Sequence, residues 1–166
     1  MRMLPLILLL MNLGAFASED KICKENIKTR SFLSEWREGD GVVNILTSIH
    51  DLEISRERGR IAYQDDLNDD GNADYIFESL DSEGSAKDRI HGIYIQCKGF
   101  LKFVGGDYFA GVRGIKVNSE NLKDIVFLSY QRNESNKIID KNGEALTKNH
   151  VWSFNSNTGR YEGEMD

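Results

Sequence analysis

The chain has 166 residues, 40% of them hydrophobic, and carries a formal net charge of −6 at pH 7. This acidic balance, without a basic cluster, excludes nucleic acid and anionic membranes as expected partners, because both bind Lys- and Arg-rich surfaces. Acidity is compatible with a bound cation or a basic protein partner, and equally with solubility alone.

The first 20 residues have the layout of a secretory signal peptide. Arg2 precedes a short apolar run from Leu4 to Leu13, and residues 15–17 form a small-x-small cleavage signal. The run is shorter than the roughly 20 apolar residues that a membrane anchor needs. We therefore expect removal of residues 1–17, no membrane span after cleavage, and a single periplasmic or secreted β-rich domain over residues 18–166.

Two cysteines, Cys23 and Cys97, remain after this cleavage. In an oxidising compartment an even pair is typical of a disulfide, and two separate buried thiols are the alternative. Closing a loop of this length would contribute roughly 4 kcal/mol on the chain-entropy estimate. A zinc site is not expected, because neither cysteine belongs to a C-x-x-C pair and the three histidines lie far apart in sequence.

Residues 24–38 show a loose helical pattern, whereas the chain after residue 40 favours strands. Ile27, Phe32, Leu33 and Trp36 fit one helical face, and a Gly-Asp-Gly sequence would end it. The later segments are rich in β-branched and aromatic residues. The expected strands lie within residues 41–54, 58–64, 73–80, 91–104, 106–117, 122–130 and 150–163. The sequence predicts a mainly β fold, an antiparallel meander that is open or sandwich-like, after a short N-terminal helix.

Two short segments fit tight hairpin connections between these strands. They are Lys98-Gly99 and the Asn-Thr-Gly sequence at residues 157–159. The mature chain contains no proline, so its turns must be built from Gly, Asn and Asp. Both segments therefore predict strands that are adjacent in sequence and antiparallel in space.

One loop at residues 66–74 has the residue types of a calcium-binding loop, and its sequence is "DLNDDGNAD". Calcium takes six to eight oxygen ligands from a flexible loop, and Gly71 at the sixth position permits a sharp turn. Crowded carboxylates repel each other unless a cation lies between them. The expected ligands are Asp66, Asn68, Asp70, the backbone carbonyl of Asn72, and Asp74. Phe77 replaces the glutamate of a complete EF-hand, and magnesium or a metal-free polar turn are the alternatives.

This D-x-N-x-D-G-x-x-D loop resembles the calcium loop of FG-GAP and VCBS repeats, which joins two strands of a β-propeller blade. The resemblance covers roughly residues 60–164 and implies that the five expected ligands occupy the family's ligand positions. It also implies two blade-like units, too few for a closed propeller.

A degraded second copy of the loop follows 50 residues later in the chain. It aligns Lys116 with Asp66 and Asp124 with Asp74, while Asn118 and Glu120 take the positions between them. Lys116 at the first ligand position and the missing glycine at the sixth make a bound cation unexpected there. We expect the second loop to be structural.

The sequence contains no nucleophile elbow, zinc-protease motif or glycine-rich phosphate loop. His50, His91 and His150 are isolated, and we expect each at the surface or half-buried. The interpretation is a non-enzymatic, calcium-binding protein that binds another protein.

Small exported bacterial proteins with such a loop resemble periplasmic immunity proteins and inhibitors of lysozyme-like cell-wall hydrolases. This resemblance implies a basic cell-wall hydrolase as partner, since the chain is acidic. Residues 79–89 and residues 131–149 are the two candidate inhibitory loops. A secreted glycan hydrolase, or an accessory domain of one, is the alternative, and an envelope protein whose calcium serves only folding is a third.

Overall fold

The computed structural model describes residues 22–23, 28–34, 41–49, 53–83, 87–118 and 122–164. The expected signal peptide, the glutamate at position 120 and the histidine at position 50 lie outside these ranges. Within them the chain forms strands in the following order: β1 (Thr29–Ser34), β2 (Val42–Ile49), β3 (Glu53–Asp65), β4 (Asp74–Glu83), β5 (Arg89–Cys97), β6 (Phe100–Phe109), β7 (Gly111–Lys116), β8 (Asp124–Tyr130), β9 (Asp140–Lys141), β10 (Glu144–Ala145), β11 (Thr147–Asn155) and β12 (Arg160–Glu162).

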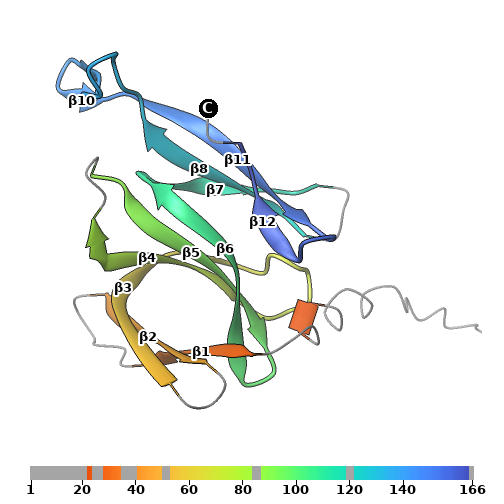
Figure 1. Cartoon of the computed structure of the whole chain (residues 1–166). Coiled ribbons are helices and arrows are strands. Elements are labelled where there is room, and N and C mark those ends of the chain that lie inside the picture. The colour runs from red at the N-terminus through yellow and green to blue at the C-terminus, as the bar shows by residue number, and fades with distance from the viewer. Residues whose placement is uncertain are drawn as a thin grey trace, which may run out of the picture.

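Strands β1 to β6 pair antiparallel in sequence order and close into a barrel (Figure 1). Closure occurs where β1 meets β6, with Ser31 opposite Leu101. Successive residues of a strand face opposite sides of the sheet, so Phe77 and Tyr94 face the barrel interior while their neighbours Ile76 and Ile93 face outward. The interior core consists of Val43, Ile45, Phe77, Tyr94 and Leu101.

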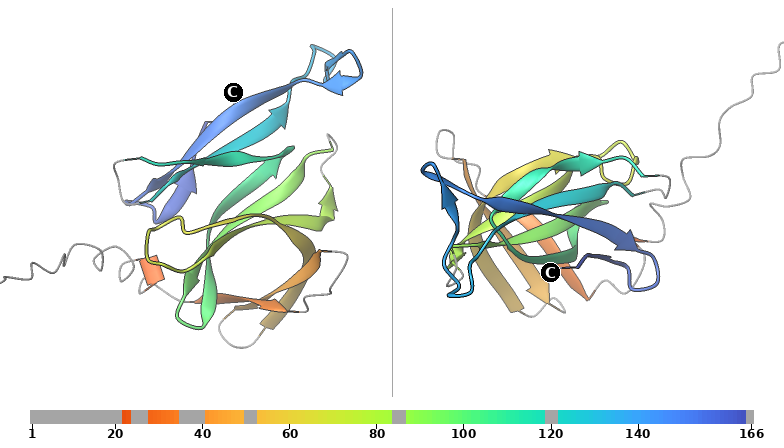
Figure 2. Two further views of the ribbon diagram at one scale, coloured as in Figure 1. Left: turned by 180° about the vertical axis from the view of Figure 1, so that it is seen from behind. Right: turned by 90° about the horizontal axis from the view of Figure 1, so that it is seen from above.

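A second sheet, in the order β12-β11-β8-β7, lies over the wall of the barrel formed by β4, β5 and β6 (Figures 1 and 2). The larger hydrophobic core fills the space between these two layers. It takes Ile76, Ile93, Ile95, Val104 and Phe109 from the barrel, and Ile125, Phe127, Trp152 and Tyr161 from the second sheet. The small β9–β10 hairpin projects from one end of the second sheet (Figure 2).

The structure confirms the predicted mainly β, antiparallel meander and both predicted hairpin connections. Gly99 and Gly159 adopt the left-handed φ values of 88° and 67° that such turns require. The barrel wall and the second sheet are layered as in a sandwich. The strands are not divided into the two similar blade-like units that we expected. Six strands form a closed barrel, and four form the sheet that covers it.

The predicted helix over residues 24–38 is wrong where the chain is described. Ile22 and Cys23 are helical, but residues 29–34 form β1. All six residues of β1 pair with β2, and the burial alternates, with Ser31 1% exposed and Phe32 40% exposed. The segment therefore has the two-residue period of a strand and not the period of a helix. Its pairing with β2 on one side and β6 on the other closes the barrel.

Cys23 and Cys97 form a disulfide whose Cα atoms are 5.6 Å apart, which confirms the predicted pair. The bond connects the segment before β1 to the last residue of β5, and Cys23 packs against the larger core. A disulfide is compatible with a periplasmic or secreted protein. Among the described residues, no helix has the length and apolar character needed to cross a bilayer.

Candidate metal centre in the loop between β3 and β4

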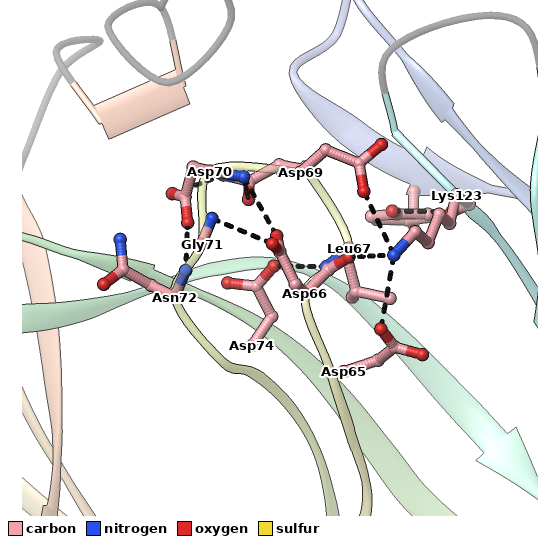
Figure 3. Close-up of polar contacts among 11 residues, drawn as sticks. Asp65, Asp66, Leu67, Asp69, Asp70, Gly71, Asn72, Asp74 and Lys123 are labelled. Carbon is pink, nitrogen blue, oxygen red and sulfur yellow. Dashed lines mark hydrogen bonds and ion pairs between the residues drawn. The ribbon is translucent and has the colours of Figure 1, made fainter. Parts of the chain in front are cut away.

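The five predicted ligand residues lie between the end of β3 and the first residue of β4. Figure 3 labels four of them, Asp66, Asp70, Asn72 and Asp74. Leu67 is 1% exposed and belongs to the larger core, so it fixes the start of the loop to the body of the protein. Asp69 and Gly71 have left-handed φ values of 54° and 87°. Glycine adopts this conformation without strain, as the sequence predicts for the sixth position of the loop.

Asp66 and Asp70 turn their carboxylates toward the backbone of the loop. Asp66 accepts hydrogen bonds from the amides of Asp70, at 3.0 Å, and Gly71, at 2.8 Å. Asp70 accepts one from the Asn72 amide at 2.7 Å and one from the Asn68 side-chain amide at 2.9 Å. Each carboxylate oxygen has a second lone pair that these bonds leave available to another partner.

Asp74, at the ninth position of the loop, is fully buried. One of its carboxylate oxygens accepts the Leu67 amide and the other accepts the Gln96 amide, both at 2.8 Å. Burial raises the pKa of Asp74 to about 7, although the two amide bonds act to lower it; the charges of Asp70 and Asp66 raise it further. Asp74 therefore ties the loop to β5, and its ionised form is costly without a positive charge nearby.

Lys123, which sequence reasoning missed, supplies a positive charge at the edge of the loop (Figure 3). Its Nζ atom donates to the Asp66 carbonyl at 2.6 Å and pairs with Asp69 at 3.1 Å and Asp65 at 3.3 Å. Burial lowers the pKa of Lys123, but the bonds and charges of Asp69 and Asp65 outweigh it, so the net shift is upward.

The degraded second loop lies directly beside the first. The Lys123 amide donates to the Leu67 carbonyl at 2.8 Å, and the Tyr161 hydroxyl donates to the Lys123 carbonyl at 2.8 Å. Asp124 begins β8 as Asp74 begins β4, but it accepts a hydrogen bond from the Asn118 side chain at 2.6 Å. Lys123 directly precedes Asp124, and it reaches the first loop only because the two loops lie side by side.

The residue types of the first loop, taken without their geometry, are those that bind a hard divalent cation. Its side-chain oxygens come from Asp66, Asn68, Asp70 and Asp74, and Asn72 offers a carbonyl, all of them ligand types that calcium prefers. A metal bound by these residues would neutralise the carboxylates. Among the described residues, no three His, Cys, Asp or Glu side chains lie close enough together to form a metal-binding group.

Two of the three histidines are buried, which corrects the expectation of surface or half-buried positions. His91 is 1% exposed and His150 is 5% exposed. His91 packs edge-on against Phe109 and Phe127 in the space between the layers, and its burial lowers its pKa. Both residues face the larger core because of their strand register, so neither lies in the metal loop.

Comparison of the chain with protein families, with curated proteins and with solved structures found no significant match. The protein is therefore a closed six-stranded barrel that a second sheet covers on one side. The acidic loop lies where the two layers meet, since its Leu67 accepts a hydrogen bond from Lys123 of the second loop.

Proposed function

We propose that this protein is an exported, non-enzymatic, calcium-binding β-domain that binds another protein. The partner that fits best is a basic cell-wall hydrolase, which the protein would inhibit. Calcium would be held by the loop at residues 66–74 and would act structurally, because that loop is tied to the core by Leu67 and to β5 by Asp74.

The inward carboxylates of Asp66 and Asp70 support the calcium part of this proposal. Their hydrogen bonds order the loop backbone, and on binding the carboxylates would only have to move closer together around the ion. The glutamate of a complete EF-hand is missing at position 77. We therefore expect weak, extracellular-type affinity, with a dissociation constant on the order of 10⁻⁴ to 10⁻³ M.

The excursion at residues 131–149 supports the protein-binding part. It is held by backbone bonds of 2.8 to 2.9 Å that join Gln131 to Leu146 and to Ile139, and Ile139 to Leu146. It extends beyond the end of the second sheet (Figure 1). An ordered, exposed loop on a rigid scaffold is a common place for recognition.

The observation that carries the proposal is an ion pair between the two candidate loops. Arg132, in the excursion, lies 3.5 Å from Asp88, next to the start of β5, and both side chains are largely buried. This pair brings residues 87–89 next to the segment 131–149, and we call the two segments together the hairpin surface. The acidic net charge of the whole chain favours association with a basic partner. The hairpin surface itself carries charges of both signs, with six basic and four acidic residues: Lys87, Arg89, Arg132, Lys137, Lys141 and Lys148 against Asp88, Glu134, Asp140 and Glu144.

The test mixes the purified protein with basic lysozyme-type hydrolases and follows the clearing of cell walls. The wild type should slow clearing. Ala145→Arg, which adds bulk and positive charge on the exposed β10, should weaken inhibition at least about tenfold, which is the loss expected when one central contact of an interface is blocked.

The matched control is Ile54→Arg, which introduces the same positively charged side chain at a position of the barrel that is 72% exposed. It should inhibit like the wild type. Full clearing in the presence of the wild type would contradict the inhibitor proposal. Turnover of polysaccharide by the protein alone would instead support the glycan hydrolase.

A further inference from the structure

A cavity of about 270 Å³ opens in the interior of the barrel, and all six barrel strands contribute to its lining. It lies apart from the residues of the metal loop and of the hairpin surface, none of which line it. Its walls differ in character: strands β1 to β3 give a polar wall, and strands β4 to β6 give an aromatic wall.

The polar wall contains three hydroxyl side chains, those of Thr29, Ser31 and Thr47, and the carboxylate of Glu57. The Ser31 and Thr47 hydroxyls are 3.0 Å apart and hydrogen-bonded. Glu57 lies directly opposite Ile45 in the β2–β3 register, and opposite residues of an antiparallel pair share one face of the sheet. Ile45 is part of the interior core, so Glu57 also faces the interior.

The cations of β3 face the other way. Arg56 and Arg58 flank Glu57 in sequence and therefore lie on the outer face. Arg56 donates to the Asn44 side chain at 2.9 Å, and Arg58 pairs with Asp81 at 3.5 Å. Among the described residues, the half-buried Glu57 carboxylate has no hydrogen-bond or ion-pair partner, and it is the one charged group of the described lining.

The aromatic wall is built from Phe77, Tyr94 and Phe103. The Tyr94 ring centroid lies 6.4 Å from that of Phe77 and 5.4 Å from that of Phe103. Gly92 keeps the space beside Tyr94 open, since a Cβ atom there would come within 2.8 Å of the Tyr94 ring. Aromatic ring faces attract cations within about 6 Å, and the Arg160 guanidinium already lies 5.7 Å from the Phe103 centroid.

These features decide between classes of ligand. An anion would be repelled by Glu57, and a purely apolar ligand would remove water from this carboxylate without giving it a partner, which is costly. A ligand with a positive charge and an apolar part satisfies both walls. The pKa of Tyr94 is raised, first by burial and then by the charge of Glu57, so this charge acts across the cavity.

We propose that the barrel cavity is a binding site for a small organic ammonium ion. Its ammonium group lies against Glu57 and the Ser31–Thr47 hydroxyl pair, and its apolar part lies among the three aromatic rings. This site is separate from the proposed calcium loop and hairpin surface, and it does not depend on either of them.

The test uses benzylammonium and its neutral analogue benzyl alcohol as probes of the full protein, with affinities from calorimetric or NMR titration. Benzylammonium should bind at least about tenfold more tightly than benzyl alcohol, the factor expected for one charge pair in a partly desolvated site. Glu57→Gln, which keeps the shape, should abolish that preference. Glu144→Gln, which removes an exposed charge on β10, should leave it unchanged.

A second variant and a localised readout guard against indirect effects. Phe103→Leu should weaken both probes several-fold, because it removes part of the aromatic wall. The amide resonances of Gly92 and Tyr94 should shift on titration with benzylammonium. Equal affinity for the two probes, an unchanged preference in Glu57→Gln, or no saturable binding at millimolar concentrations would each overturn the proposal.

Discussion

The loop at residues 66–74 and its degraded copy at residues 116–124 occupy equivalent places in their strand pairs but differ in charge. Each ends with an aspartate that begins the next strand, Asp74 in β4 and Asp124 in β8. Asp74 is fully buried and holds two backbone amides, whereas Asp124 holds the side chain of Asn118. The same position therefore performs two different structural tasks.

The difference shows how one loop complements the other. The first loop concentrates carboxylates, and the second contributes Lys123, whose Nζ atom contacts Asp65, Asp69 and the carbonyl of Asp66. Part of the repulsion in the first loop is therefore neutralised by the protein itself. A bound cation would act on the carboxylates that Lys123 does not contact, Asp66 and Asp70.

The largest expected difference between the loops concerns their final aspartates. Asp74→Ala leaves the buried amides of Leu67 and Gln96 without an acceptor, and should lower the free energy of unfolding by about 3 kcal/mol. Asp124→Ala should cost about 1 kcal/mol, because its partner Asn118 is a half-buried side chain. Urea denaturation in EDTA measures both losses. Equal losses in the free energy of unfolding would show that Asp74 and Asp124 contribute equally to stability.

Exchanging the residue at the first ligand position sharpens the comparison. At about 10 to 100 times the dissociation constant, calcium should raise the free energy of unfolding of the wild type by about 1–3 kcal/mol. Asp66→Lys gives the first loop the residue that the second has at Lys116, and should remove this response. Thermal melting in calcium and in EDTA measures it.

The reverse exchange, Lys116→Asp, is the control for that measurement. It should create no second calcium response, because Asn121 stands where Gly71 permits the turn in the first loop. A calcium response that survives in Asp66→Lys would show that the stabilising calcium ion binds outside the loop at residues 66–74.

The pH dependence should also distinguish the two loops. The pKa of Asp74 is about 7 in the folded protein, above the ordinary aspartate value of 3.8, so the folded state retains a proton that the unfolded state releases. In EDTA this contribution to stability is full below about pH 4 and is lost as the pH rises through about 7. Denaturation of the wild type and Asp74→Asn at pH 5 and pH 8 isolates it.

We expect the wild type to lose roughly 2 to 3 kcal/mol more than Asp74→Asn between these two pH values, because about two pH units lie between pH 5 and the pKa of Asp74 and each is worth about 1.4 kcal/mol. Saturating calcium should reduce this difference, because a cation favours the ionised carboxylate. An identical pH dependence of the two proteins would contradict the assignment to Asp74.

The smallest expected effect is that of the lysine that joins the loops. Lys123→Met keeps much of the side-chain length but removes the charge near Asp65 and Asp69. It should lower the free energy of unfolding in EDTA by about 1 kcal/mol, a typical value for a partly buried ion pair. The loss should be smaller in saturating calcium, and calcium should bind more tightly. A loss that is the same in both buffers would separate Lys123 from the metal loop.

Much of this fold could be predicted from local sequence patterns. The strands after residue 40, the turns at Gly99 and Gly159 and the loop around Gly71 each depend on residues close together in the chain. The pair Cys23–Cys97 followed from the cysteine count and the expected compartment. In each of these cases the determining residues are themselves visible in a single sequence.

The features that could not be predicted depend on contacts between distant residues. Residues 29–34 are too short a segment to separate a two-residue period from a helical one, and their pairing with β6 joins positions 31 and 101. The charged sequence around Glu57 predicts an exposed strand. Only the pairing of Glu57 with Ile45 shows that its side chain faces the interior of the barrel. Lys123 contacts the metal loop because the second loop lies beside it, and no local sequence pattern predicts that two loops so far apart in the sequence are neighbours.

The disulfide is a covalent tether beside the seam that closes the barrel. Cys23 precedes β1, the strand that closes the wall, and Cys97 ends β5, beside the strand to which β1 docks. When the hydrogen bonds at the Ser31–Leu101 seam break, this covalent tether keeps β1 near its docking position. Chemical reduction would remove this tether, and β1 would then be held beside β6 only by the seam itself and by its pairing with β2.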